Sequence, residues 1–160
     1  MSRMFQVSEL VQVAVDDEKS GVAFYSRLAQ KARQAGLKKT FADLAEQERG
    51  HQKRFEHMLA DLGDYKAPDS YADEYLTYVH TLTSQRAFPD EQAAQRAATE
   101  CKDDASAVEL AIGFERDTLI LMGEMRGMVR EKDRAIVDQL IDEERSHLVV
   151  LGAARAKLTG

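Results

Sequence analysis

Apolar residues recur at alternating steps of three and four along most of the chain, a spacing that places side chains on one face of an α-helix. In one such stretch, Leu37, Phe41 and Leu44 begin an apolar stripe that continues through Phe55 to Leu62. The same pattern occurs in four long stretches, and it predicts an all-α fold. The four predicted helices cover approximately residues 7–35, 37–62, 103–130 and 133–158.

Short polar breaks divide the chain into two halves. Residues 34–36 (Gln-Ala-Gly) form a stop signal between the first two stretches, and residues 131–133 (Glu-Lys-Asp) separate the last two. Connections this short make consecutive helices antiparallel neighbours. Each half is therefore predicted to be an antiparallel helical hairpin.

The segment between the hairpins, residues 63–102, contains both prolines of the chain. It is too long for a structureless connection in a compact domain. We therefore predict a partly helical crossover, with short helices at about Ser70–Thr83 and Asp90–Glu100. Such a crossover can run the length of the molecule and dock the second hairpin on the first, giving a four-helix bundle in one domain, residues 1–160.

Composition and charge narrow the classes of partner. A formal charge of -6 and a pI near 5.3 argue against binding to nucleic acids or to anionic membranes, which both require clustered lysine and arginine. Cys101 is the only cysteine, so no disulfide within the chain is expected. We find no signal-peptide pattern and no stretch of transmembrane length, and we expect a soluble cytoplasmic protein.

Six side chains of metal-ligand type interrupt the apolar stripes. Glu48 and His51 form one Glu-x-x-His segment, and Glu144 and His147 form a second in the other half of the chain. Residues three apart on a helix face the same way, so each pair can bind one ion or bridge two. Each segment follows a helix that carries one more glutamate on its stripe, as expected for a duplicated hairpin. The full set is Glu18, Glu48, His51, Glu115, Glu144 and His147.

Four glutamates on buried stripes need compensating charge, because an unpaired buried carboxylate costs several kcal/mol. The stripes carry no lysine or arginine at the positions concerned, whereas two divalent ions would balance four carboxylates. Oxygen ligands with one imidazole per metal suit iron or manganese, and zinc can also occupy such a site. A single Glu-x-x-His is common by chance, but two copies on equivalent stripes predict a two-metal centre.

The same apolar pattern predicts that other polar residues lie at the surface or have a structural role. We expect His57 and His80 to lie at the surface or in a satisfied position, because neither falls on a stripe with other ligands. Asp17 and Glu143 are also expected to face solvent. Tyr25 lies on the stripe of the first helix, and we expect it to fill the core rather than to bind a ligand carboxylate.

The motifs resemble those of the ferritin-like di-iron carboxylate superfamily, and most closely its rubrerythrin branch. The resemblance lies in the segments 18–25 (EKSGVAFY), 44–51 (LAEQERGH), 111–117 (AIGFERD) and 142–147 (DEERSH). It implies a ferritin-like bundle in which Glu48 and Glu144 bridge two irons. The remaining four ligands that it implies are Glu18, His51, Glu115 and His147.

The resemblance also implies a reaction with hydrogen peroxide or dioxygen. Full rubrerythrins carry a rubredoxin module with paired cysteines, which this chain lacks. Electrons would then come from a separate donor, such as a rubredoxin-type protein. Two alternatives remain open: an iron-binding or storage protein with ferroxidase chemistry only, and a structural metal site. A homodimer is expected on the weaker ground that Gly123 and Gly127 permit a close helix contact.

Overall fold

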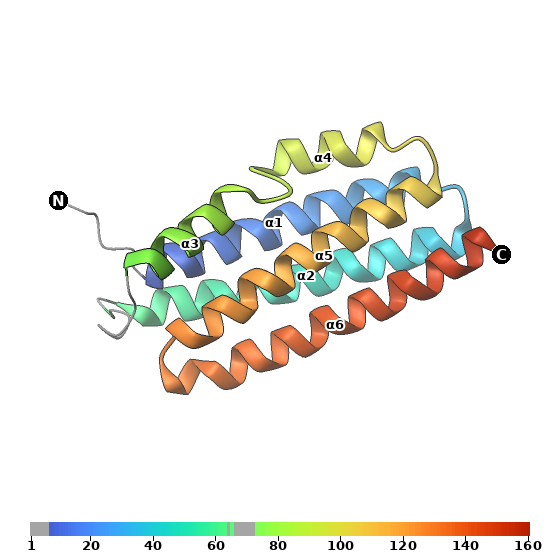
Figure 1. Ribbon diagram of the computed structural model, residues 1–160. Helices are drawn as coiled ribbons and strands as arrows, with labels where there is room; N and C mark the ends of the chain where they lie inside the picture. The colour runs from blue at the N-terminus through green and yellow to red at the C-terminus, as the bar shows by residue number, and fades with distance from the viewer. Residues whose placement is uncertain (1–6, 64, 66–72) are drawn as a thin grey trace.

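The computed structural model describes residues 7–63, 65 and 73–160, and within them it contains helices and no strands (Figure 1). The predicted all-α four-helix bundle is thereby confirmed. Four long helices form the bundle and two short ones lie along its side. The helices are α1 (Val7–Lys31), α2 (Ala35–Leu62), α3 (Asp73–Ser84), α4 (Glu91–Glu100), α5 (Asp104–Met128) and α6 (Glu131–Thr159).

The bundle consists of two hairpins, α1 with α2 and α5 with α6, as the short connections predicted. The hairpins meet where α1 packs against α5 and α2 against α6. The crossover runs along one side of the bundle, with α3 next to α5 and α4 next to α1 (Figure 1). This path returns the chain to the end of the bundle at which α1 ends, so α5 can begin there.

The first helix ends at Lys31, four residues before the predicted position, and α2 already begins at Ala35. The expected stop residue Gly36 therefore lies inside α2. The cause is a contact from the other hairpin: the Asp104 carboxylate accepts hydrogen bonds from the backbone N–H groups of Arg33, at 3.0 Å, and Gln34, at 3.1 Å. These N–H groups bond to Asp104 rather than to helix carbonyls, and the chain turns at this point.

The other boundaries differ from the prediction by smaller amounts. Helix α4 begins after Asp90, whose side chain accepts a hydrogen bond from the backbone of Ala93 at 2.7 Å. Helix α6 begins at Glu131, so the polar segment expected to separate the helices forms its first turn instead. The predicted start of the first crossover helix, at Ser70, lies outside the described residues.

The apolar core forms two clusters, one in each half of the bundle's length. One cluster includes Leu10, Phe55 and Met125, and the other includes Phe24, Phe41 and Leu151. Within each long helix, the predicted ligand residues separate members of the first cluster from members of the second. The site described below therefore lies between two packed apolar regions.

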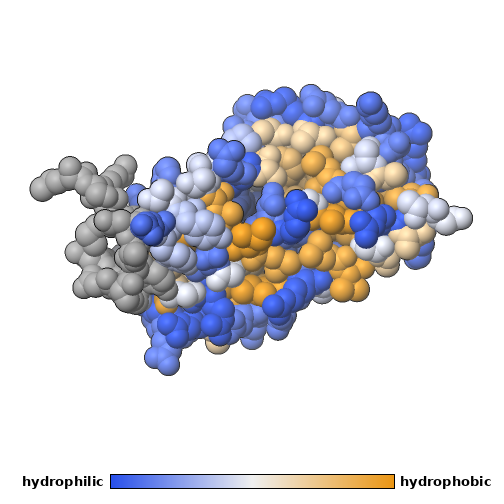
Figure 2. Space-filling model, viewed as in Figure 1, coloured by the Kyte–Doolittle hydropathy of each residue, from blue (hydrophilic) through white to orange (hydrophobic). Residues whose placement is uncertain are grey.

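The surface is largely hydrophilic, with apolar side chains gathered over the middle of the face shown in Figure 2. Among the described residues, the large apolar side chains with the greatest exposure include Ile120, Val149 and Val150. No helix in the described parts of the chain is both long enough and apolar enough to cross a membrane.

Candidate metal centre

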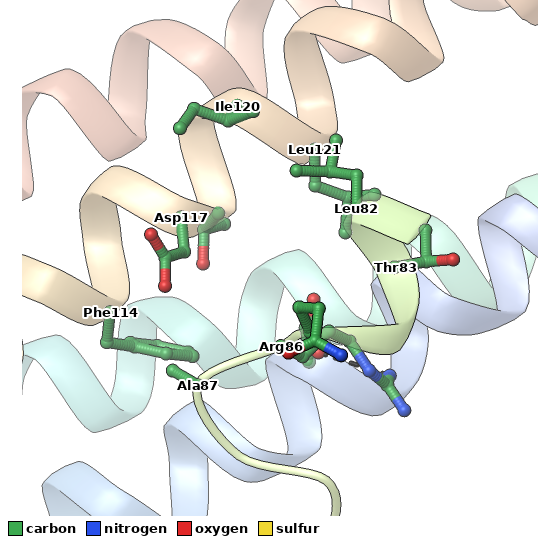
Figure 3. A pocket seen from close by; sticks show the side chains of 11 residues that line it. Leu82, Thr83, Arg86, Ala87, Phe114, Asp117, Ile120 and Leu121 are labelled. Carbon is green, nitrogen blue, oxygen red and sulfur yellow. Dashed lines mark hydrogen bonds and ion pairs between the residues drawn. The ribbon is translucent and has the colours of Figure 1, made fainter. Parts of the chain in front are cut away.

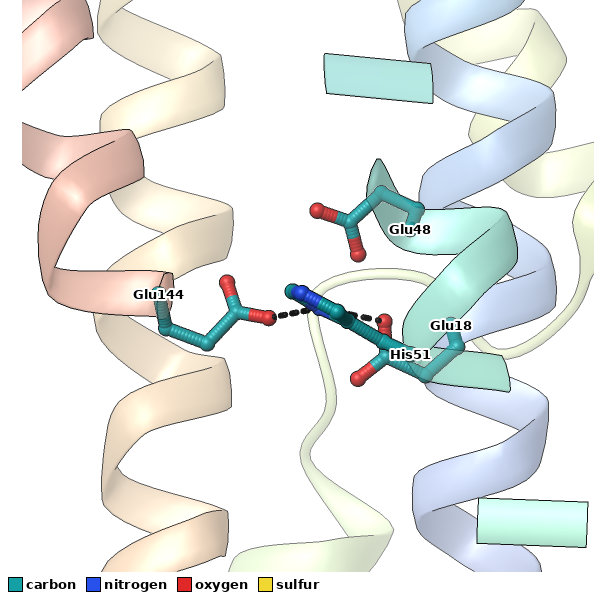
Figure 4. A group of neighbouring side chains, drawn as sticks. All are labelled: Glu18, Glu48, His51 and Glu144. Atoms are coloured by element: carbon teal, nitrogen blue, oxygen red, sulfur yellow. Dashed lines mark ion pairs between the residues drawn. The ribbon is translucent and has the colours of Figure 1, made fainter. Parts of the chain in front are cut away.

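All six predicted ligand residues meet at the middle of the bundle. Glu18 comes from α1 and Glu115 from α5, and the two Glu-x-x-His segments come from α2 and α6. Each of the six side chains is at most 1% exposed. Figure 4 shows the carboxylate of Glu144 reaching from α6 toward the ring of His51 on α2. The duplicated pattern therefore brings the two hairpins together at a single cluster.

The cluster divides into two sets of four ligands. One set is Glu18, Glu48, His51 and Glu144, and the other is Glu48, Glu115, Glu144 and His147. In each set, one ligand atom from every residue lies within 4.8 Å of all the others. Glu48 and Glu144 belong to both sets. They therefore have the position that a bridge between two metal ions requires.

Both histidines turn Nδ1 toward the interior of the cluster. His51 Nδ1 lies 2.5 Å from Glu144 Oε1, and His147 Nδ1 lies 3.0 Å from Glu144 Oε2 and 3.1 Å from Glu48 Oε1. The two rings are stacked, with centroids 5.3 Å apart. Nδ1 is therefore the nitrogen available to a metal, and Nε2 of each ring points to a residue outside the cluster.

The cluster contains polar atoms that the protein leaves without hydrogen bonds. In the described part of the chain, every buried side-chain nitrogen or oxygen atom without a hydrogen-bond partner belongs to these six residues. Native proteins satisfy nearly all such atoms, so each exception needs an explanation. The close contacts between them do not have hydrogen-bond geometry. The residues that carry these atoms form the two sets of four described above, an arrangement typical of metal ligands. The unpartnered atoms are both oxygens of Glu18, Glu48 and Glu144, Oε2 of Glu115, and Nδ1 of His51 and His147.

Burial and mutual repulsion change the protonation of these groups in the metal-free chain. Burial raises the pKa of Glu18 and of Glu115 well above 4.5, and the neighbouring carboxylates raise it further. Burial opposes the charged form of His147, but the carboxylates of Glu115 and Glu144 raise its pKa to about 12. Protons therefore provide part of the compensating charge that the carboxylates need, and cations could replace them.

Tyr25 does more than fill the core, which was the role expected from the sequence. Its ring is fully buried between Phe24 and Phe41, and its hydroxyl also donates a hydrogen bond to Oε1 of Glu115. Burial raises the pKa of this hydroxyl well above 10.0, and the negative charge of the Glu115 carboxylate raises it further. Tyr25 is therefore a permanent donor to one ligand oxygen.

Glu143 was expected to face solvent, but it contacts the cluster. Its Oε2 lies 2.9 Å from His51 Nε2, and its Oε1 accepts a hydrogen bond from Arg54 at 2.9 Å. Burial opposes the effect of Arg54, whose hydrogen bond keeps the pKa of this carboxyl below 4.5. The equivalent contact on the other histidine comes from Gln47, whose Oε1 lies 3.3 Å from His147 Nε2. Gln47 and Glu143 each directly precede the glutamate of a Glu-x-x-His segment, and this shared position was the signal in the sequence that could have identified them.

Asp17 was also predicted to face solvent, whereas it is only 7% exposed and pairs with Arg86 at 3.2 Å. Burial raises its pKa to about 7, against the opposing effect of Arg86. The loop that carries Arg86 comes from the crossover, so its arrival at α1 could not be read from the helical pattern. His57 and His80 are exposed, in agreement with the expectation that they lie outside the site.

A cavity of about 110 Å³ lies next to Asp17 and Arg86 (Figure 3). Its other walls are formed by α5, through Phe114 and Thr118, and by the end of α3. Asp17 and Phe114 are the immediate neighbours of Glu18 and Glu115 in sequence. The cavity therefore borders the same turns of α1 and α5 that present ligands to the cluster.

Comparison with known proteins places this geometry in a family. The sequence profile of the rubrerythrin family matches residues 9–154. Among solved structures, a protein of Thermotoga maritima described as a ferritin-like diiron-carboxylate protein superposes with a TM-score of 0.71 and 26% sequence identity. The match covers 98% of this chain and 98% of that one. None of the curated proteins matches the chain significantly.

Proposed function

The chain belongs to the rubrerythrin family, and we propose that its buried cluster binds two iron ions and reacts with hydrogen peroxide or dioxygen. The observation that carries the proposal is the set of buried, unpartnered oxygen and nitrogen atoms at the centre of the bundle. Such atoms are costly unless a cation binds them.

The ligand set fits two divalent ions in both charge and chemistry. Two such ions carry four positive charges, which balance the four glutamates when these are ionised. Each ion would have one imidazole nitrogen and several carboxylate oxygens, a mixture that suits iron or manganese and also admits zinc. We propose iron as the working metal because its ferrous and ferric states allow electron transfer to an oxidant.

The residues of the chain have distinct roles in this proposal. Glu18 and His51 would hold one ion, Glu115 and His147 the other, and Glu48 and Glu144 would lie between the two. Because the six side chains are almost completely buried, the protein excludes bulk water from the centre. The Tyr25 hydroxyl keeps its proton and fixes one oxygen of its ligand partner.

We propose that the electrons come from another protein. Reduction of one hydrogen peroxide to two waters consumes two electrons and two protons. The chain has one cysteine, Cys101, and so contains no rubredoxin-type iron site of its own. We therefore propose a separate donor of the rubredoxin class, acting in the cytoplasm.

The test begins with anaerobic addition of ferrous iron to metal-free protein, followed by peroxide or dioxygen. We expect two irons per chain, oxidation detected by the absorption of the ferric product, and repeated turnover when a reductant is present. Uptake of iron far beyond two per chain would instead indicate storage. Binding of metal without any oxidation would indicate a structural site.

A pair of substitutions tests the ligand assignment. Glu48→Ala combined with Glu144→Ala removes both shared carboxylates, so we expect paired metal binding to be lost while helical circular dichroism is retained. Glu46→Ala combined with Glu109→Ala is the matched control, because these glutamates are exposed and lie outside both ligand sets. Retention of two metals by the first variant would show that the site lies elsewhere.

A further inference from the structure

The two ligand sets are related by the internal repeat, but the residues that support their histidines differ. Gln47 and Glu143 occupy equivalent positions, each directly before the glutamate of a Glu-x-x-His segment. Each reaches across the bundle to the histidine of the other segment. Glu143 contacts Nε2 of His51 at 2.9 Å, and Gln47 contacts Nε2 of His147 at 3.3 Å. One imidazole therefore has a carboxylate partner and the other has a neutral amide.

The carboxylate partner is also the more firmly held of the two. Arg54 donates one hydrogen bond to each oxygen of Glu143, so the carboxylate is fixed while it accepts from His51. Gln47 is exposed, and its amide nitrogen makes only a long contact of 3.4 Å with the backbone oxygen of Asp43. The ring of His51 is thus oriented by a closer and better anchored acceptor.

A second difference concerns the terminal glutamates of the two sets. Tyr25 lies two turns after Glu18 in α1, and its hydroxyl occupies Oε1 of Glu115. Met122, at the equivalent position two turns after Glu115 in α5, has no hydroxyl to offer Glu18. Neither oxygen of Glu18 has a hydrogen-bond partner, whereas at Glu115 only Oε2 lacks one, and the hydrogen bond from Tyr25 makes Oε1 a weaker ligand.

We propose that these differences make the two metal positions unequal, so that the position held by Glu18 and His51 binds its ion first and more tightly than the one held by Glu115 and His147. A carboxylate that accepts from the outer nitrogen of a histidine makes the imidazole a stronger ligand and fixes its orientation. The absence of a competing hydrogen bond at Glu18 acts in the same direction. The inference rests on the proposed function, because it requires that the paired metal site exists.

Cobalt(II) alone is a suitable probe, because its visible absorption reports binding without any oxidation. Anaerobic titration of the metal-free full chain should give two steps whose affinities differ by at least about tenfold, the lower end of the effect of such outer contacts. A crystal structure with one equivalent of cobalt, located by anomalous scattering, should show the ion at Glu18 and His51.

Substitutions that exchange Glu143 and Gln47 test whether these two residues determine which metal position is filled first. Glu143→Gln should weaken the first step by about 10-fold to 100-fold, so that the two steps merge. Gln47→Glu should strengthen the second step, and this also reduces the difference in affinity between the two steps. Glu46→Gln is the control for charge: this exposed carboxylate on α2 pairs with Arg49, so both steps should be unchanged. Gln47→Glu carries the test alone if Glu143→Gln fails to fold.

The outcomes separate this inference from the proposed function. Two cobalt ions bound with equal affinity, or a first ion at His147, would overturn the inference and leave the paired site standing. Titrations of Glu143→Gln and Gln47→Glu that both match the wild-type curve would do the same. A wild-type chain that binds no cobalt would overturn the proposed function as well.

Discussion

At the scale of single residues, Gly21 provides the space that a bridging carboxylate occupies. It lies on the buried face of α1, one turn after Glu18. A Cβ atom at this position would lie 3.0 Å from Glu48 Oε2 and 3.2 Å from Phe114 Cε1. Both distances are shorter than ordinary van der Waals contacts, so any side chain here would displace the glutamate or the ring.

Gly21→Ala is therefore expected to weaken metal binding by at least about tenfold, by moving Glu48 away from its shared position. The metal-free variant should also fail to gain the roughly 1 kcal/mol that alanine usually adds in a helix. Cobalt titration and urea unfolding measure the two effects. In the control Gly152→Ala, the added Cβ meets nothing within 4 Å, so stability should rise and affinity should stay the same. Wild-type affinity in Gly21→Ala would disprove the steric argument.

Sequence reasoning identified the six clustered residues because each places a polar group on an otherwise apolar stripe. It did not assign Glu143 to the cluster, because this residue lies off the stripe of α6 and its side chain is 42% exposed. Its contact with His51 depends on how closely α6 approaches α2, which no periodicity within one helix can specify. The same applies to the hydrogen bond from Tyr25, which joins α1 to α5.

At the scale of helices, Asp104 connects the two hairpins at one end of the bundle. It is the first residue of α5, and its carboxylate accepts from two backbone N–H groups in the turn between α1 and α2. The preceding residue, Asp103, instead forms a capping box with Ser106 inside its own helix. Adjacent aspartates thus serve different purposes, one between hairpins and one within α5.

Asp104→Ala should lower the free energy of unfolding by about 1–2 kcal/mol, because two hydrogen bonds to a charged acceptor are lost from a partly exposed site. Urea unfolding followed by circular dichroism measures the change. Asp104→Asn retains one acceptor oxygen and should recover part of the loss. A difference from wild type below about 0.5 kcal/mol, the range usual for neutral surface substitutions, would contradict the role given to this contact.

The helical pattern predicted the order of the long helices and most of their extent, but not where α1 ends. Residues 32–35 have ordinary helix-forming composition, but the N–H groups of Arg33 and Gln34 bond to Asp104 of α5. The first turn of α6 was missed for a different reason. Its polar residues look like a break, yet Asp133 is buried and pairs with Arg130 at 2.6 Å. The first error comes from a contact with a distant helix, and the second from a local ion pair with the residue that precedes α6.

At the scale of the whole molecule, the charged cluster lies between two apolar clusters that pack without it. These clusters contain most of the buried apolar side chains, so we expect the metal-free chain to remain helical. Metal binding would add stability according to its concentration relative to the dissociation constant, by about 2.7 kcal/mol at a hundredfold excess. For a chain of this length, that gain corresponds to a rise in melting temperature of roughly 5–10 °C.

The gain in stability from metal should increase with pH. Folding raises the pKa values of Glu18 and Glu115 above 4.5, so their contribution to the stability of the metal-free chain is complete below that pH and is lost as the pH rises. Folding also raises the pKa of His147 from 6.5 to about 12. The contribution of His147 to the stability of the metal-free chain is therefore complete below pH 6.5 and is lost as the pH rises above it. Metal ions replace these protons, and they do so more easily when the proton concentration is low.

Thermal melts of metal-free and cobalt-loaded protein at about pH 5.5 and about pH 8 measure this dependence. We expect the difference in melting temperature to be several degrees larger at the higher pH, because the metal-free form loses stability there while the metal-bound form does not. The variant with Glu48→Ala and Glu144→Ala provides the control, since without the shared ligands cobalt should leave its melting temperature unchanged at both pH values. A difference that is equal at the two pH values in the wild-type protein would show that metal does not displace the protons of these buried groups.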